Sequence, residues 1–224
     1  MVVWYYETMF IDLSVLINEE TPVYPGDPAA KIEPAGVLDK DGYTDHYVSL
    51  GTHIGTHIDA PMHVLPNANS LDQVPIEQFV GRGRRIKIED SFDLETVKAA
   101  DIQPGDIVLF HTCMSDKYHD TAYFDDYPVM SEEIANYLVQ QKVKMVGVDA
   151  CSVDKEDSFP IHKTLLSGNV LIIENLTNIN QLAGKDFTVY ALPIKLQIDG
   201  APARVMAAVK AWISIQGLSK PFKR

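Results

Sequence analysis

The sequence is poor in cysteine and has no long apolar stretch. Two cysteines, Cys113 and Cys151, are too few for the disulfide framework of a small secreted protein. Each lies beside an apolar, strand-like run, which predicts small buried thiols. No window approaches the roughly 20 apolar residues of a membrane span. The N-terminus also lacks the basic start and cleavage site of a signal peptide. We therefore expect a cytoplasmic protein that does not bind a membrane.

Basic residues are also scarce relative to acidic ones. Lys and Arg number 19 against 31 Asp and Glu, which gives a net charge of -12. Such an excess of negative charge disfavours nucleic acid and anionic lipid as partners, because both carry the same sign. The chain further lacks a GxSxG elbow, a P-loop and a dinucleotide-binding fingerprint.

The length and apolar pattern predict one α/β domain that spans residues 1–224. The chain is 46% hydrophobic, which is ample for a core, and no linker divides it. Helices are expected after the caps Asp93 and Ser131 and around residues 161–166. Because helices lie between some strands while others follow directly, we expect a three-layer or barrel-like fold with a mixed sheet. Strands are predicted at residues 10–17, 43–50, 84–88, 107–110, 145–148, 170–173, 187–192 and 203–213.

Against this background, one short segment is rich in metal-ligating side chains. Residues 52–64 read THIGTHIDAPMHV, which places His53, His57, Asp59 and His63 within eleven residues. Imidazole suits zinc, manganese or iron, and a carboxylate can bridge two ions. Any one of these histidines alone would be interpreted as an ordinary hydrogen-bonded residue. The cluster as a whole predicts a metal site.

The spacing of the cluster favours an extended or irregular segment. All four residues have odd numbers, and side chains two apart in an extended chain point the same way. On a helix, His57 and Asp59 would point in nearly opposite directions. Gly55 and Pro61 are expected to shape the segment. The pattern therefore differs from HExxH, in which a helix supplies both histidines.

Two later residues are candidates to complete the site. His162 stands at the expected start of a short helix, and Glu174 ends the very apolar run VLIIEN. A glutamate at the carboxyl end of a strand is well placed for a site in an α/β protein. The alternatives are a helix-start surface histidine and a solvated strand end, and the residues alone leave both open.

The motifs resemble those of the cyclase-family metal-dependent hydrolases, which include bacterial kynurenine formamidase (arylformamidase) and isatin hydrolase. Residues 53–63 are similar to that family's HxGTHxDxPxH signature, and residues 21–27 (TPVYPGD) to its TPxWPGD segment. Residues 147–154 (GVDACSVD) resemble its GxDxxSxD stretch. His162 and Glu174 fall where the family supplies its distal ligands. The resemblance thus covers most of the chain.

This resemblance implies a role for each candidate residue. His53, His57 and Asp59 would hold one divalent ion, and Asp59 would bridge to a second ion held by His162 and Glu174. One or two ions are implied, zinc first and manganese second. His63 would be the general acid/base rather than a ligand. Tyr24 stands where the formamidases have a substrate-contacting tryptophan, so it is a candidate substrate-binding residue and a departure that bears on the substrate.

The family further implies a swivelling β/β/α fold and a homo-oligomer, a dimer or a tetramer. The aromatic N-terminal segment (Trp4, Tyr5, Tyr6, Phe10) could form a subunit contact or pack on its own core. The implied activity is hydrolysis of an aryl formamide such as N-formylkynurenine by metal-activated water. Three alternatives stay open: hydrolysis of a cyclic amide or lactone such as isatin, metal binding without catalysis, and carbon–carbon cyclase or lyase chemistry.

Overall fold

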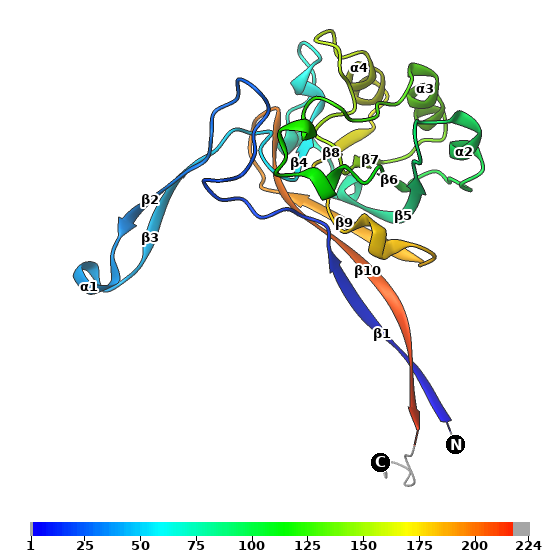
Figure 1. Cartoon of the computed structure of the whole chain (residues 1–224), viewed down its shortest axis with the longest axis horizontal. Coiled ribbons are helices and arrows are strands. Elements are labelled where there is room, and N and C mark those ends of the chain that lie inside the picture. Colours follow the sequence, from blue (N-terminus) through cyan, green and yellow to red (C-terminus); the bar gives the residue numbers. More distant parts are fainter. Residues whose placement is uncertain (1, 217–224) are drawn as a thin grey trace.

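A closed, mixed sheet forms the centre of the molecule (Figure 1). The computed structural model describes residues 2–216, and the side chains of residues 7–210. The main sheet has the order β1-β10-β4-β8-β7-β6-β5-β9, and β9 pairs again with β10, which closes the sheet into a barrel. The strands described are β1 (Val2–Asp12), β2 (Lys31–Gly36), β3 (Asp45–Ser49), β4 (His57–Asp59), β5 (Val80–Lys87), β6 (Ile107–His111), β7 (Met145–Val148), β8 (Leu171–Glu174), β9 (Phe187–Pro193) and β10 (Gly200–Gln216).

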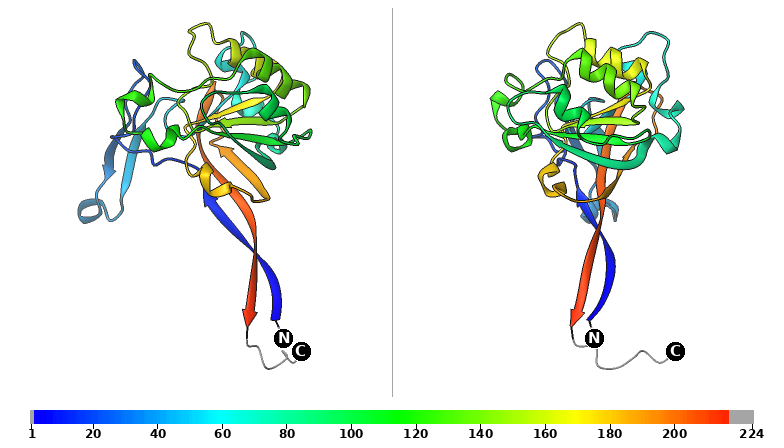
Figure 2. Two further views of the ribbon diagram at one scale, coloured as in Figure 1. Left: turned by 45° about the vertical axis from the view of Figure 1, so that its right-hand side comes forward. Right: turned by 90° about the vertical axis from the view of Figure 1, so that its right-hand side faces the viewer.

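Four parallel strands, β5 to β8, form one side of this barrel. Every residue of β6, β7 and β8 is buried, which explains why these strands read as continuous apolar runs rather than as alternating ones. Helices α2, α3 and α4 cover their outer face in all views (Figures 1 and 2). The helices described are α1 (Leu38–Asp41), α2 (Leu94–Lys98), α3 (Glu132–Gln140) and α4 (Pro160–Ser167), with short 3-10 turns η1 (Pro61–His63), η2 (Leu71–Gln73), η3 (Ile76–Phe79), η4 (Met114–Lys117), η5 (Thr121–Tyr123) and η6 (Ile179–Leu182).

Two caps that the sequence predicts are confirmed. The Asp93 carboxylate accepts a hydrogen bond from the Thr96 amide at the start of α2, and the Ser131 hydroxyl accepts one from the Ile134 amide at the start of α3. The mixed α/β architecture is confirmed as well, in its barrel-like form.

Other expectations need correction. Cys113 is exposed, whereas Cys151 is buried as expected. Strand β1 ends at Asp12 instead of continuing to residue 17, because the chain makes only an isolated bridge at Ser14. The sequence pattern also missed β2, and it did not single out β4 as a strand. In the described part of the chain, no helix is long and apolar enough to cross a membrane.

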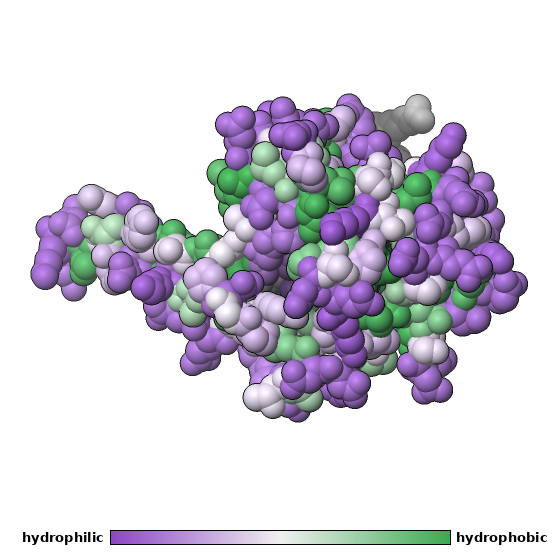
Figure 3. All heavy atoms as spheres, turned by 90° about the horizontal axis from the view of Figure 1, so that it is seen from above, coloured by the Kyte–Doolittle hydropathy of each residue, from purple (hydrophilic) through white to green (hydrophobic). Residues whose placement is uncertain are grey.

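Two antiparallel ribbons project from the barrel. One is formed by β1 and the distal part of β10, and the other by β2 and β3 with α1 at its tip (Figure 1). The β2–β3 ribbon is the lobe at the left of Figure 3. The second ribbon is exposed along all of β3, and it carries solvent-exposed apolar side chains. Phe10 on the first ribbon is 63% exposed, while the side chains of Trp4, Tyr5 and Tyr6 lie outside the described ones. The exposed apolar residues of the second ribbon are Val37, Leu38, Tyr43, Tyr47 and Val48.

Candidate metal centre

Strand β4 presents two of the predicted ligands on one face. His57 and Asp59 are two residues apart in this extended segment, so both side chains point to the same side, and both are buried. The strand lies between β8 and β10 in the barrel. Its pairing with β8 places His57 directly opposite Glu174. Register alone therefore brings residues distant in sequence into one cluster.

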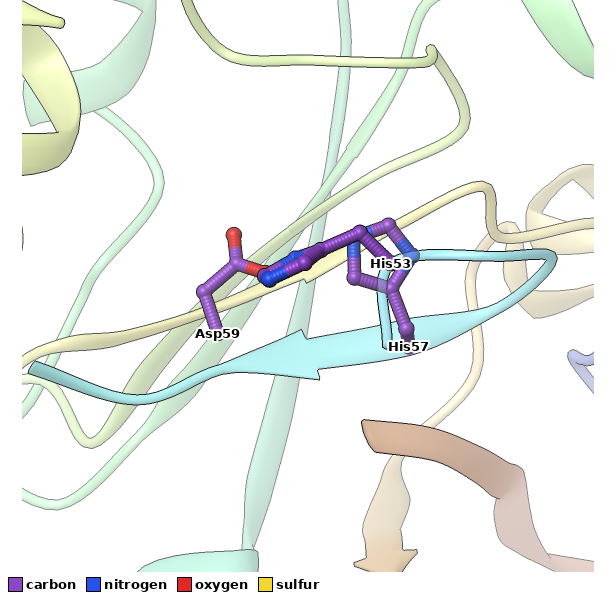
Figure 4. A group of neighbouring side chains, drawn as sticks. All are labelled: His53, His57 and Asp59. Carbon is purple, nitrogen blue, oxygen red and sulfur yellow. The ribbon is translucent and has the colours of Figure 1, made fainter. Parts of the chain in front are cut away.

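A tight turn before β4 returns His53 to the same cluster. Gly55 makes this turn with a φ of 60°, and a Cβ there would lie 2.7 Å from the Ile17 side chain, so only glycine fits. The His53 Nδ1 lies 2.7 Å from Asp59 Oδ1. Figure 4 shows the rings of His53 and His57 gathered with the Asp59 carboxylate above β4. The expected irregular shape of the segment, set by Gly55, is confirmed.

The start of helix α4 supplies His162. Pro160 occupies the first turn, and the Asp154 carboxylate accepts hydrogen bonds from the backbone amides of Ile161 and His162. The same carboxylate accepts a 2.8 Å bond from His162 Nδ1. His162 Nε2 then lies 3.4 Å from both Asp59 Oδ2 and Glu174 Oε1. The surface-histidine alternative is therefore wrong for His162, which is buried.

Glu174 is likewise a buried member of the cluster and not a solvated strand end. Its side chain is 6% exposed, and its Oε1 accepts a 3.1 Å hydrogen bond from the Val153 amide. Its Oε2 lies 3.4 Å from His57 Nε2. Glu174 and Asp59 thus lie as two buried carboxylates on either side of the same imidazoles.

The outer nitrogens of His57 and His162 are fixed in a way that suits metal ligation. The Nδ1 of His57 donates to the Gly55 carbonyl at 2.8 Å, as the Nδ1 of His162 donates to Asp154. Each bond leaves Nε2 as the nitrogen directed at Asp59 and Glu174. Metal-ligating histidines are usually oriented by such an outer hydrogen bond. Among the described residues, the buried atoms His57 Nε2 and Asp59 Oδ2 have no hydrogen-bond partner.

The buried negative charges of the cluster also favour a bound cation. Burial lowers the pKa of His57, but Asp59 and Glu174 outweigh this effect and raise it to about 10. Burial raises the pKa of Asp59, yet the adjacent His53 and His57 hold it well below its usual value. Buried carboxylates need a compensating positive charge, because their desolvation is costly. Orphaned atoms, donor types and charge together fit one or two divalent ions held by His53, His57, Asp59, His162 and Glu174.

His63 lies beside this cluster without joining its carboxylates. It ends the 3-10 turn η1, which Pro61 begins, so Pro61 shapes the segment as expected. An extended conformation is not found at His63 itself. Its ring lies against that of His53, with centroids 4.0 Å apart and a tilt of 35°. Burial is the main cause that lowers its pKa. A neutral imidazole next to a metal site suits proton transfer, although this role stays a prediction.

The cluster opens into a cavity of about 230 Å³. A larger open groove of about 550 Å³ lies elsewhere on the chain, but none of the clustered imidazoles lines it, so the smaller cavity is the candidate site. Tyr24 lines the cavity and meets Phe124 edge-on at 6.0 Å. Phe159 packs edge-on near His63 and His162. The cavity walls comprise Pro22, Tyr24, Asp27, Phe124, Cys151, Ser152, Asp154, Lys155, Glu156, Asp157, Phe159 and Asn175, together with His63 and four residues of the cluster, His53, His57, His162 and Glu174.

Sequence reasoning missed two carboxylates at this site. Asp154 falls within the GVDACSVD stretch, but nothing in that stretch indicates its contact with His162. Asp199 lies in the turn before β10 and accepts a 2.9 Å hydrogen bond from His53 Nε2. Its position depends on the pairing of β10 with β4, and no local pattern signals it.

Comparison with known families agrees with this arrangement. A family model described as "Putative cyclase" matches residues 11–155, which include the β4 cluster. The chain belongs to this cyclase family. Relatives are similar over most of the chain. An uncharacterized protein of Methanocaldococcus jannaschii, MJ0783, is 35% identical over 188 residues, which are 82% of this chain and 91% of the relative.

Two further comparisons concern proteins of known activity. A kynurenine formamidase of Salinibacter ruber is 31% identical over 204 residues, which are 88% of this chain and 95% of the relative. The crystal structure of an isatin hydrolase bound to the product analogue thioisatinate aligns with a TM-score of 0.81 at 23% identity, covering 92% of this chain and 94% of that chain. This second likeness shows the shared cyclase-family fold.

Proposed function

We propose that this chain is a metal-dependent amidohydrolase that hydrolyses an aryl formamide such as N-formylkynurenine, a step in the kynurenine pathway of tryptophan catabolism. The main support is the arrangement of two imidazoles and two carboxylates beside the cavity. His57 Nε2 and His162 Nε2 each lie 3.3 to 3.4 Å from carboxylate oxygens of Asp59 and Glu174. Structural metal sites are usually closed by four ligands and often by cysteine. The mixed oxygen and imidazole donors beside a cavity support a catalytic site over metal binding alone.

The divalent ions, zinc or manganese, would supply a water of lowered pKa and an electrophile for the carbonyl oxygen. The chain's residues supply position and proton transfer. His63 takes the proton of the attacking water and delivers it to the leaving nitrogen, which its neutral state allows. An arylamine leaves more readily than an alkylamine. Tyr24, Phe124 and Phe159 supply aromatic walls against which such a ring can pack.

A direct assay tests the proposal. The protein loaded with zinc or with manganese is analysed for metal content and then assayed on N-formylkynurenine in ¹⁸O-labelled water. We expect turnover and one ¹⁸O atom in the formate released. Product formed without label would indicate cyclase or lyase chemistry. A metal-loaded protein that turns over no substrate would indicate that the chain binds metal without catalysis.

Hydrolysis of isatin is the second candidate, and the structural likeness to an isatin hydrolase favours it. Isatin, like an aryl formamide, has an amide carbonyl bonded to a nitrogen on a benzene ring. The same residues could therefore bind and hydrolyse it. Tyr24, which stands where the resemblance gives the formamidases a tryptophan, leaves this alternative open. The ratio of kcat/KM for N-formylkynurenine and isatin decides between the two.

We further propose that the protein is a homo-oligomer, a dimer or a tetramer. The β2–β3 ribbon supports this, because an isolated two-stranded ribbon is marginally stable in water and this one exposes Leu38, Tyr43 and Tyr47. Light scattering on the wild type and on Tyr47→Asp tests it. A smaller mass for the variant is expected, and a monomeric wild type would contradict the proposal.

The remaining expectations accompany this function as proposals. They are the swivelling β/β/α type of fold, a single domain over residues 1–224, a cytoplasmic location, and a small aromatic amide as partner in place of nucleic acid or membrane.

A further inference from the structure

Asp199 is held firmly at the edge of the metal centre. Its carbonyl accepts a 2.8 Å hydrogen bond from the Ala60 amide, and the next residue, Gly200, pairs with Asp59 in the β10–β4 ladder. A Cβ at Gly200 would lie 2.8 Å from the His53 ring and 2.8 Å from the Ile58 carbonyl, so this turn packs directly on the site. Backbone pairing therefore fixes where the Asp199 carboxylate stands.

One oxygen of this carboxylate faces two histidines. Asp199 Oδ2 accepts a 2.9 Å hydrogen bond from His53 Nε2 and lies 3.6 Å from His63 Nδ1. The two rings stack with their centroids 4.0 Å apart. A single carboxylate thus connects a predicted ligand with the predicted acid/base.

The contact with His53 follows the pattern of the other two ligand histidines. His57 is held by the Gly55 carbonyl and His162 by Asp154, each through the nitrogen that faces away from Asp59. When Asp199 accepts a hydrogen bond from His53 Nε2, Nδ1 is the nitrogen left facing Asp59, 2.7 Å away. With a metal bound, all three imidazoles would then present an unprotonated nitrogen on the side of Asp59.

We propose that Asp199 is a positioning residue that orients both His53 as a metal ligand and His63 as the acid/base. In His53 it selects the tautomer that ligates through Nδ1. In His63 its contact with Nδ1 leaves Nε2 as the nitrogen that exchanges a proton with water and the leaving group. Both effects act through a histidine, because Asp199 itself does not touch Asp59 or Glu174. The His63 part rests on the proposed hydrolase function, whereas the His53 part requires only a metal site.

Zinc affinity tests the His53 part without any substrate. Asp199→Ala, Asp199→Asn and the control Asp90→Asn are titrated against a chromophoric chelator. Asp90 is exposed and does not line the cavity. Loss of an outer partner typically weakens metal binding about 10–100-fold, so this loss is expected for the alanine variant. Asparagine retains an accepting oxygen and should lose less. Affinity within twofold of wild type in Asp199→Ala would overturn the His53 part.

Turnover at saturating zinc tests the His63 part. Once the metal site is filled, the alanine variant should lose at least tenfold in kcat with little change in KM, while Asp90→Asn keeps wild-type values. An unchanged kcat would overturn the shared role. If Asp199→Ala does not fold, judged by circular dichroism, the asparagine variant decides, because its side chain has the same shape. A wild type that binds zinc but hydrolyses neither substrate would refute the proposed function and leave the affinity test intact.

Discussion

Asp154 holds His162 in place through both its backbone and its ring. The carboxylate accepts from the His162 amide at 2.9 Å and from Nδ1 at 2.8 Å, so helix start and ring orientation are set by one group. Burial raises the pKa of Asp154, but its bonds to His162 outweigh this and lower it, which keeps the acceptor ionised. The ligand on α4 is thereby tied to the loop that follows β7.

Replacing Asp154 should therefore affect stability and metal binding together. In Asp154→Ala, two backbone amides and a ring nitrogen lose their acceptor, which should lower the free energy of unfolding by about 1–3 kcal/mol. Zinc affinity should fall about 10–100-fold because His162 is no longer oriented. Urea denaturation and chelator competition measure the two effects. Asp154→Asn, which keeps one accepting oxygen, should lie between, and wild-type zinc affinity in the alanine variant would contradict the assignment.

His63 and Asp59 should separate catalysis from metal binding. We expect His63→Ala to lose most of its turnover while its metal content stays at the wild-type level, because the ion pair that His63 forms is with Asp199 and not with the buried carboxylates Asp59 and Glu174. We expect Asp59→Asn to lose metal itself, because this carboxylate lies between all the ligand nitrogens. Elemental analysis with steady-state assays measures both. Full metal and activity in Asp59→Asn would show that the bridging role is wrong.

Removal of the metal should destabilise the protein. Two buried carboxylates, Asp59 and Glu174, are compensated by the ion in the loaded protein, and a ligand present at 100 times its Kd stabilises by about 2.7 kcal/mol. Thermal unfolding is compared for protein with added zinc and for protein treated with a chelator. We expect a higher Tm with zinc, and no shift in the matched variant Asp59→Asn. Equal Tm values for loaded and stripped wild type would contradict a site in this cluster.

The sequence predicted the inner part of the site but not its surroundings. Ligand types and the Gly55 turn are local features, so His53, His57 and Asp59 could be grouped in advance. The alternation argument failed at His63, because Pro61 starts a 3-10 turn instead of continuing the strand. The contribution of Asp199 depends on the pairing of β10 with β4, which no local pattern encodes.

The same reasoning explains which elements were missed. Strand β4 has three residues, too few for a hydrophobic period to stand out. Strand β2 is exposed over most of its length and contains Pro34, so its apolar and polar residues do not alternate as they do on a half-buried strand. In contrast, buried strands such as β6 and β8 were readily recognised because their whole length is apolar.

Gly55 should be required both because it has no side chain and because it adopts a left-handed backbone conformation. Gly55→Ala places a Cβ 2.7 Å from Ile17, in a left-handed conformation that costs an alanine about 1–2 kcal/mol. Gly184→Ala is the matched control, since Gly184 has a φ of 67° and nothing within 4 Å of an added Cβ. In urea denaturation, the free energy of unfolding should fall in both variants by the cost of the left-handed alanine. It should fall further in Gly55→Ala, which should also bind zinc more weakly. Equal losses with unchanged zinc affinity would show that the turn does not constrain His53.

Phe159 should contribute to recognition of an aromatic substrate. This residue precedes the first turn of α4 in a left-handed conformation, with a φ of 52°, and 37% of the residue is exposed beside the cavity. The ring centroid lies 6.1 Å from that of His63 and 5.4 Å from that of His162, so it forms a wall next to the reacting groups. A strained conformation kept at such a position is typical of functional sites.

Phe159→Gly removes this ring and fits the left-handed backbone without strain. An aromatic contact contributes about 0.5–1.5 kcal/mol beyond its buried area, so the KM for formanilide should rise at least two- to tenfold while kcat changes less. Phe159→Tyr keeps the aromatic face and should keep a KM near that of the wild type. Zinc content serves as the control, because the ring ligates nothing. A glycine variant with an unchanged KM would show that the substrate ring packs elsewhere, with Tyr24 and Phe124 as the remaining aromatic walls.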